Sequence, residues 1–218
     1  MTPPILYQST RLLIIDKPAG LACHAGPHSG ASVEDFFPYW RRGHDGPWLA
    51  HRLDTDTAGC LAIARRKTTL IALQAAFAAH TVQKTYWAVV RGVPHDSAGT
   101  ITTPLSKQTD PSGWRMVANS RGLPAVTDWH VLARGSGRAL LELTPGTGRT
   151  HQLRVHCAGM GHPIIGDPVY GTAAEGLCLL ARRLVLPLDP RVEVEASMPA
   201  HIRRALQGGG IFDRLEAV

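Results

Sequence analysis

The pattern of apolar and polar positions predicts strands in several parts of the chain. Residues 12–16 and 61–64 are short apolar runs, which are typical of buried strands. Residues 85–92 alternate between two faces, as expected for a strand with different environments on its two sides. Residues 125–133 and 138–144 predict an antiparallel pair joined by a glycine-containing turn, and residues 177–188 predict one or two further strands.

Helical periodicity is clearest at residues 68–80, where Leu70, Leu73 and Phe77 share one face. A second helix is expected at residues 150–159, with Thr150 as its N-cap. Shorter helices are expected near residues 32–40, within an otherwise irregular stretch from 24 to 48, and after Pro199. Residues 93–124 are rich in turn formers and predict a long excursion with one hairpin.

Strands that follow one another in runs favour an α+β fold over a strictly alternating α/β fold. We therefore expect a mixed, largely antiparallel β-sheet with flanking helices and loops. A chain of 218 residues suits one large domain or two small subdomains.

Composition and charge narrow the range of partners. The formal net charge is +6, which favours a polyanionic partner such as nucleic acid. The four cysteines form no C-x-x-C pair, so neither a zinc site nor a disulfide framework is indicated. No apolar run approaches the roughly 20 residues of a membrane span. The N-terminus lacks the pattern of a secretory signal, so the cytoplasm is the expected compartment.

Charged residues stand directly before the apolar run at 61–64, in the stretch HRLDTDTAG from residue 51 to 59. Asp54 needs a nearby cation if it lies inside the protein. Arg154, at the edge of an apolar helix face, needs an anion for the same reason, so each is a candidate partner of the other. Asp56 is a turn residue or, alternatively, a second carboxylate of a glycosidase-like pair.

Other candidate motifs have simple alternatives. GTGRT at residues 146–150 lacks the spacing of a nucleotide-binding loop, and its glycines are expected to form the turn before the helix. His151 and His156 are five residues apart and do not share a helical face, so we expect no metal site. The basic run Arg65, Arg66 and Lys67 stands unfavourably at a helix start, which indicates an external anion or a solvated turn.

Five stretches resemble the RluA-type pseudouridine synthases, in the order in which that family has them: DKPAGLACH, HRLDTDTAG, KTYWAVVRG, TGRTHQLRVH and GHPIIGDPVYG. The resemblance implies the pseudouridine synthase fold, with helices and loops around a central RNA-binding cleft. It covers about residues 12–180 and implies that residues 1–218 form a single catalytic domain, without the small N-terminal RNA-binding domain of many relatives. It implies no cofactor and no metal, and we expect a monomer.

The resemblance also implies roles for individual residues. Asp54 matches the catalytic nucleophile, Tyr86 the tyrosine that stacks on the target base, and Arg154 the arginine that pairs with the aspartate. Arg52 matches the residue that takes the place of the flipped base, and Leu179 an apolar residue under the base. Five more residues of these motifs are expected to contact RNA: His51, Thr57, Arg149, His151 and Gln152.

The implied reaction detaches uracil from its ribose, turns it and rejoins it through carbon. A carboxylate such as Asp54 can attack either the sugar carbon or the uracil ring, and the sequence leaves both open. Without the resemblance, Tyr86 is equally an ordinary packed strand residue. We expect the substrate to be tRNA or rRNA. The competing functions are a catalytically silent RNA-binding or RNA-folding protein of the same fold, and a glycoside hydrolase that uses Asp54 and Asp56.

Overall fold

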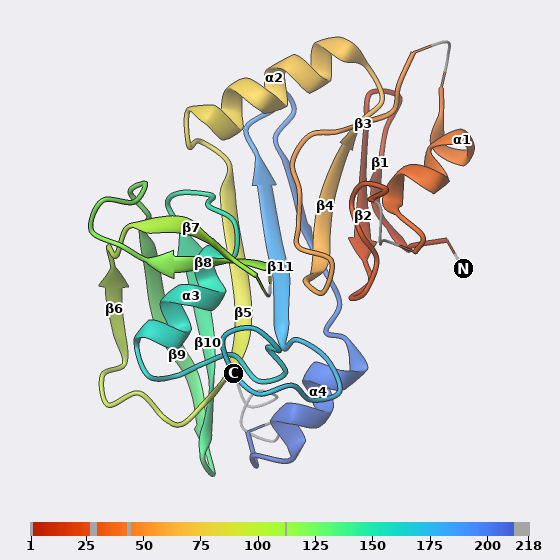
Figure 1. The fold of residues 1–218 in the computed structure, drawn as a ribbon. Coiled ribbons are helices and arrows are strands. Elements are labelled where there is room, and N and C mark those ends of the chain that lie inside the picture. Colours follow the sequence, from red (N-terminus) through yellow and green to blue (C-terminus); the bar gives the residue numbers. More distant parts are fainter. Residues whose placement is uncertain (1, 27–29, 43–44, 112, 212–218) are drawn as a thin grey trace. The chain divides into compact units, whose positions relative to one another are not determined.

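The computed structural model describes residues 2–26, 30–42, 45–111 and 113–211 (Figure 1). The chain divides into two compact units. The first unit contains residues 1–84 and 180–197, and the second contains residues 85–179 and 198–218.

The first unit is built on a mixed sheet. Its strands are β1 (Ile5–Gln8), β2 (Leu12–Lys17), β3 (Trp48–Leu49), β4 (Ala58–Ala64), β11 (Leu179–Leu186) and β12 (Val192–Glu195). β2 pairs antiparallel with β1 and β4, and β3 also pairs antiparallel with β4. β4 and β11 run parallel, and β12 returns antiparallel to β11. The helices of this unit are the 3₁₀ helix η1 (Val33–Phe36), α1 (Phe37–Trp40) and α2 (Lys67–Ala78).

The apolar runs of the sequence form the centre of this sheet. β4 is buried at all seven of its positions, and the four residues Leu12 to Ile15 of β2 are at most 1% exposed. Because both faces of these strands are covered, they show continuous hydrophobicity in place of alternation. Leu73 of α2 is fully buried, as the helical spacing around it predicts.

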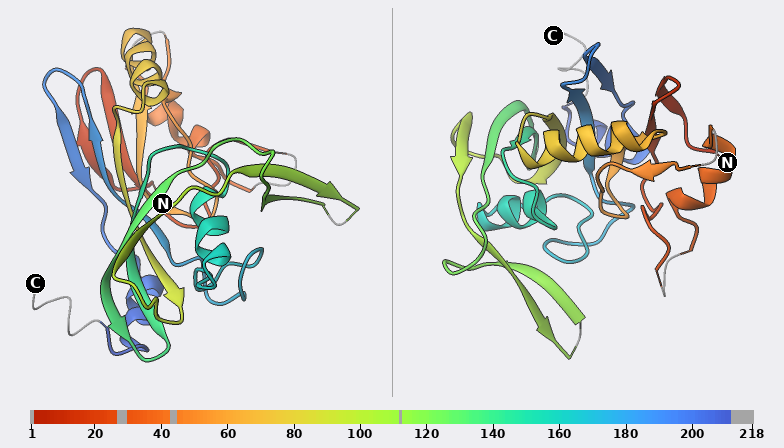
Figure 2. Two further views of the ribbon diagram at one scale, coloured as in Figure 1. Left: turned by 90° about the vertical axis from the view of Figure 1, so that its left-hand side faces the viewer. Right: turned by 90° about the horizontal axis from the view of Figure 1, so that it is seen from above.

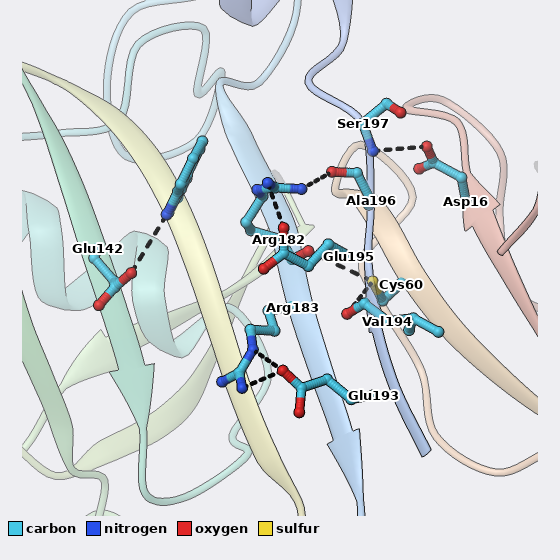
Figure 3. A network of polar contacts seen from close by, with 11 residues as sticks. Asp16, Cys60, Glu142, Arg182, Arg183, Glu193, Val194, Glu195, Ala196 and Ser197 are labelled. Carbon is cyan, nitrogen blue, oxygen red and sulfur yellow. Dashed lines mark hydrogen bonds and ion pairs between the residues drawn. The ribbon is translucent and has the colours of Figure 1, made fainter. Parts of the chain in front are cut away.

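Charged side chains fix the pairing of β11 with β12 (Figure 3). Arg182 forms an ion pair with Glu195 at 2.5 Å, and Arg183 forms another with Glu193. The chain then continues past β2, where the amide of Ser197 donates to Asp16 at 3.2 Å. Opposite charges across an antiparallel pair help to set its register.

The second unit has an antiparallel sheet in the order β5–β10–β9–β6, together with a separate hairpin and two helices. Its elements are β5 (Gln83–Arg91), β6 (Ala98–Ile101), β7 (Leu105–Asp110), β8 (Gly113–Ala118), β9 (Thr127–Gly135), β10 (Arg138–Pro145), α3 (Gln152–Gly159) and α4 (Ala200–Gln207). Figure 2 shows the β7–β8 hairpin extending away from the rest of its unit.

The expected mixed, largely antiparallel α+β fold is confirmed, with shifts of a few residues at element ends. Of the stretch from 24 to 48, residues 27–29 and 43–44 lie outside the described part of the chain. The expected N-cap Thr150 is wrong: the second helix starts at Gln152, and His151 precedes it with a left-handed φ of 51°. The short strands β1, β3, β6 and β12 were not predicted.

Candidate active-site residues

Asp54 lies in the loop between β3 and β4, where it is partly exposed. The amide of Thr57 donates to the Asp54 carbonyl at 3.1 Å and closes a turn. Two groups from the end of β2 and its following turn hold the next residue: the Thr55 carbonyl accepts from Lys17 Nζ at 2.8 Å and from the Gly20 amide at 2.9 Å. The backbone that presents Asp54 is therefore fixed from both sides. Asp56 lies within this turn, as one of its two interpretations predicts.

Lys17 is fully buried and holds this loop through its ammonium group. Besides Thr55, Nζ donates to the Leu21 carbonyl at 2.7 Å and to the Pro18 carbonyl at 3.0 Å. Burial lowers the pKa of Lys17 to about 8, although the nearby carboxylates of Asp54 and Asp56 favour the charged form. A buried cation with three carbonyl acceptors explains why a lysine belongs in the DKPAG stretch.

The loop has two further attachments. The Leu53 amide donates to Cys23 Sγ at 3.4 Å, and the Cys23 thiol donates to the Leu53 carbonyl at 3.3 Å. At the start of β4, Gly59 adopts a φ of +114°, and a Cβ there would lie 2.3 Å from the carbonyl oxygen of Ala181 in β11. Only glycine fits this close approach, so the final glycine of HRLDTDTAG is required by the pairing of the two strands.

The other sequence-predicted residues of this loop differ in exposure. Arg52 is exposed, and Thr57 is only 2% exposed. His51 Nε2 accepts from the Ala62 amide at 3.0 Å, and its ring centroid lies 4.7 Å from that of Phe77 in α2. Burial lowers the pKa of His51 to about 3, so its imidazole is neutral at physiological pH. Through these contacts His51 packs against other residues of the first unit. Its predicted contact with RNA stays a prediction.

In the second unit, Arg154 is buried in α3 and forms a bidentate ion pair with Asp167. Nε donates to Oδ2 at 2.8 Å, and Nη2 donates to Oδ1 at 2.9 Å. The guanidinium also lies 5.3 Å from the ring centroid of Tyr170. From the sequence, the Arg154 guanidinium was expected to need an anion if it pointed inward, and Asp54 was the candidate, so Asp167 was not identified. The signal was present, because Asp167 is the aspartate of GHPIIGDPVYG.

Asp167 is fully buried, and its carboxylate accepts hydrogen bonds from backbone amides as well as from the Arg154 guanidinium. Its Oδ1 also accepts from the amides of Val169 at 2.9 Å and Tyr170 at 3.1 Å. Burial alone would raise the pKa of Asp167, but the hydrogen bonds from Arg154 and the two amides outweigh it and hold that pKa below its usual value. The carboxylate is therefore ionised, and it fixes the orientation of Arg154.

Tyr86 lies in β5 opposite Leu143 of β10 and is partly buried. Tyr86 is therefore more exposed than Ala88, Val89 and Val90 of the same strand, which are fully buried. Leu179, the predicted apolar contact of the base, is 3% exposed.

The turn before α3 is organised by Gln152, which is 3% exposed. Its Oε1 accepts from Thr147 Oγ1 at 2.7 Å and from the Arg149 amide at 3.0 Å, while its Nε2 donates to the Val126 carbonyl at 2.9 Å. Arg149 Nε donates to the Pro124 carbonyl at 3.0 Å. Gln152 and Arg149 thus shape the GTGRT turn, and their predicted RNA contacts stay predictions.

His151 connects α3 to the β7–β8 hairpin. Its Nδ1 is 2.9 Å from the hydroxyl of Tyr170, and its ring stacks on that of Trp114 with a centroid distance of 5.3 Å. Lys107 Nζ lies 4.8 Å from the Trp114 ring centroid. Trp114 is 49% exposed and was not singled out from the sequence, although it is an aromatic residue within a predicted hairpin.

The described residues contain no group of three or more histidine, cysteine or acidic side chains that could hold a metal ion. His156 is buried, with one ring nitrogen 2.9 Å from Thr127 Oγ1 and the other 3.0 Å from the Thr103 carbonyl. No helix in the described part of the chain is long and apolar enough to cross a membrane. Asp54 belongs to the first unit, and Tyr86 and Arg154 belong to the second, so the expected pairing of Asp54 with Arg154 stays a prediction.

Comparison with known proteins defines the class. The sequence profile of the family described as RNA pseudouridylate synthase matches residues 11–159. An uncharacterised RNA pseudouridine synthase of Zymomonas mobilis is 45% identical over 177 residues, which are 77% of this chain and 78% of that relative. Ribosomal large subunit pseudouridine synthase C of Vibrio cholerae is 36% identical over 93% of this chain and 68% of its own length. The solved structure of human RNA pseudouridylate synthase domain containing 4 has a TM-score of 0.81 at 30% identity, and it covers 95% of this chain and 93% of its own.

The chain therefore belongs to the RNA pseudouridylate synthase family. Within that family it is of the RluA type, and it is an RNA pseudouridine synthase, an isomerase that acts on RNA.

Proposed function

We propose that this chain converts a specific uridine of structured RNA to pseudouridine, with Asp54 as the nucleophile. The family match from residue 11 to 159 is the observation on which this rests, because it spans Asp54, Tyr86 and Arg154. Large-subunit ribosomal RNA is the first candidate substrate, since relatives named ribosomal large subunit pseudouridine synthase C are 36% to 38% identical to this chain. Transfer RNA is the competing substrate.

The reaction breaks the bond between ribose C1′ and uracil N1 and forms one between C1′ and C5. The hydrogen on C5 leaves as a proton and N1 takes up a proton, so atoms balance without an oxidant or a reductant. Asp54 provides a carboxylate that attacks covalently, at the sugar or at the ring, and then departs. Its loop suits this role, because Lys17 and the Cys23–Leu53 contacts fix the backbone while the Asp54 side chain stays partly exposed.

Arg154 and Tyr86 have supporting roles in this proposal. A guanidinium held by Asp167 and Tyr170 keeps one orientation, which is what is needed to orient a nucleophilic carboxylate. The target base must leave its stack at a cost of a few kcal/mol. Stacking on an aromatic side chain returns about 1–3 kcal/mol, and the partly buried ring of Tyr86 is proposed to provide it.

Chemical mapping of pseudouridine in ribosomal and transfer RNA tests the substrate. Cells that lack this chain are compared with cells that express the wild type or Asp54→Asn. We expect a modification in large-subunit ribosomal RNA to be absent without the chain, to return with the wild type and to stay absent with the variant. A change confined to transfer RNA would reassign the substrate, and identical maps in all cells would contradict the proposed function. The monomeric state and the cytoplasmic location expected from the sequence stay predictions.

A further inference from the structure

A hollow of about 550 Å³ lies on the first unit, at the end of β4 that is distant from the Asp54 loop. We call it the arginine pocket. It is lined by Gln8, Ser9, Thr10, Arg42, Arg65 and Arg66. Three of these six residues are arginines and none is acidic, so the lining strongly favours an anion.

The three arginines have no counterion among the described residues. No ion pair joins Arg42, Arg65 or Arg66 to a carboxylate in the described ranges of the chain. Like-charged groups that line one hollow repel each other, and Arg42 and burial together lower the pKa of Arg65, with burial as the larger cause. An external anion would relieve this repulsion.

Arg65 provides an independent indication of a ligand. It is only 4% exposed, and its Nη1 donates to the Ser9 carbonyl at 2.9 Å. Its Nε is buried and makes no hydrogen bond to any described residue. A buried guanidinium with an unsatisfied N–H is costly unless an acceptor completes it.

The start of α2 adds to the same field. Arg66 is the N-cap of this 12-residue helix, and neither a side-chain cap nor an acidic residue is found at its first turn. A helix N-terminus favours negative charge, yet this one presents Arg66 and Lys67. An anion bound in the arginine pocket would offset the repulsion between these basic side chains and the positive N-terminus of α2.

We propose that the arginine pocket binds a backbone phosphate of the substrate RNA, at a point remote from the reacting nucleotide. This proposal rests on the proposed function for the identity of the RNA. β4 separates the pocket from the Asp54 loop by seven residues, which at about 3.3 Å per residue is roughly 20 Å. The pocket is therefore an anchor for RNA that flanks the target, and it contributes to binding without touching the reacting atoms.

The first test is the salt dependence of binding to a transcript of large-subunit ribosomal RNA. The variant Arg42→Gln/Arg66→Gln removes two exposed arginines that form no ion pair with any residue that the structure describes, so folding should be preserved. The association constant K falls as salt rises, and we expect the slope of log K against log salt to become less steep by about one unit in this variant. If the variant and the wild type bind RNA equally well at 1 M salt, a difference of one in slope makes the variant bind about tenfold more weakly at 0.1 M salt. At saturating RNA, kcat should be unchanged while KM rises.

A charge-matched control separates a site from a general charge effect. Arg191→Gln/Arg203→Gln also removes two exposed arginines, but from outside the pocket. This control should leave the slope within error of the wild type. An equal decrease in slope for both double variants would overturn the proposal, as would an unchanged slope for the pocket variant.

The second test uses inorganic phosphate and needs neither RNA nor catalysis. We expect phosphate to shift the Nε–H resonance of Arg65 in the NMR spectrum of the full chain, and the pocket variant to lose this response. Phosphate binding without any effect of the pocket variant on RNA binding would overturn the assignment to the RNA backbone. Wild-type chain that binds RNA but makes no pseudouridine would contradict the proposed function alone, because the salt slope and the Arg65 response are measured independently of it.

Discussion

Replacing Asp167 with asparagine should destabilise the second unit by about 3–5 kcal/mol, the usual cost of removing one partner from a buried ion pair. The side chain of Asp167 is fully buried, and that of Arg154 is 5% exposed, so solvent offers little compensation. Asparagine can keep one oxygen for the amides of Val169 and Tyr170, but its amino group then faces Arg154 Nε, which is also a donor.

Urea unfolding followed by circular dichroism measures the loss. Asp128→Asn is the matched control, because Asp128 is exposed in the same unit, and it should change the free energy of unfolding by about 0.5 kcal/mol or less. A double variant, Arg154→Met/Asp167→Leu, should regain most of the stability because it leaves no buried charge unpaired. It should not regain activity, since Arg154 is lost.

The stabilisation from the Arg154–Asp167 ion pair should decrease as the pH falls. Because the pKa of Asp167 is held below its usual value near 3.8, its ion pair stabilises the fold above that pH. The stabilisation is lost as the pH falls through the lowered pKa, so the gap between wild type and Asp167→Asn should narrow in acid. An Asp167→Asn protein within about 1 kcal/mol of the wild type at neutral pH would refute this reasoning, as would a double variant no more stable than Asp167→Asn.

Two substitutions and one pH titration test the supports of the Asp54 loop. Lys17→Met removes the ammonium donor from the Pro18 and Leu21 carbonyls and leaves the Thr55 carbonyl with the Gly20 amide alone. It should lower the free energy of unfolding by about 2–5 kcal/mol, measured by urea unfolding, and a loss below about 1 kcal/mol would contradict the role of the ammonium. Gly59→Ala places a Cβ against the Ala181 carbonyl and should cost about 3 kcal/mol or more from overpacking and strain, and a stable, active variant would show that β4 and β11 are less closely apposed. The imidazole of His51 should stay neutral from pH 7 to pH 4 in an NMR titration, because burial lowers its pKa to about 3, and charging near pH 6.5 would refute its burial.

The sequence predicted the central elements because their patterns are dictated by local physics. The apolar run of β4 and the helical spacing of Leu73 in α2 need no information about distant residues. The short strands β1, β3, β6 and β12 have two to four residues each, too few to show a period. The start of α3 was misplaced because Gln152, and not Thr150, satisfies the turn that precedes it.

The candidate site shows the same division between local and distant effects. The need of Arg154 for an anion could be inferred from its place on a helix, but the choice of Asp167 depends on the path of the chain after α3. Likewise, the lysine of DKPAG gives no sign in sequence that its ammonium holds the Thr55 carbonyl, which is 38 residues away. The basic run at Arg65 left open an external anion or a solvated turn, and the proposed anion site depends on Ser9 and Arg42, which line the same hollow and are distant in sequence.

The nucleophile is tested most directly by tritium release from RNA labelled at uracil C5, because forming the new carbon–carbon bond must displace that hydrogen. Wild-type chain should release tritium from the RNA identified by mapping, and Asp54→Asn should release none above background while binding the same RNA with unchanged affinity. Equal release by the two proteins would contradict the assignment of Asp54 as the nucleophile.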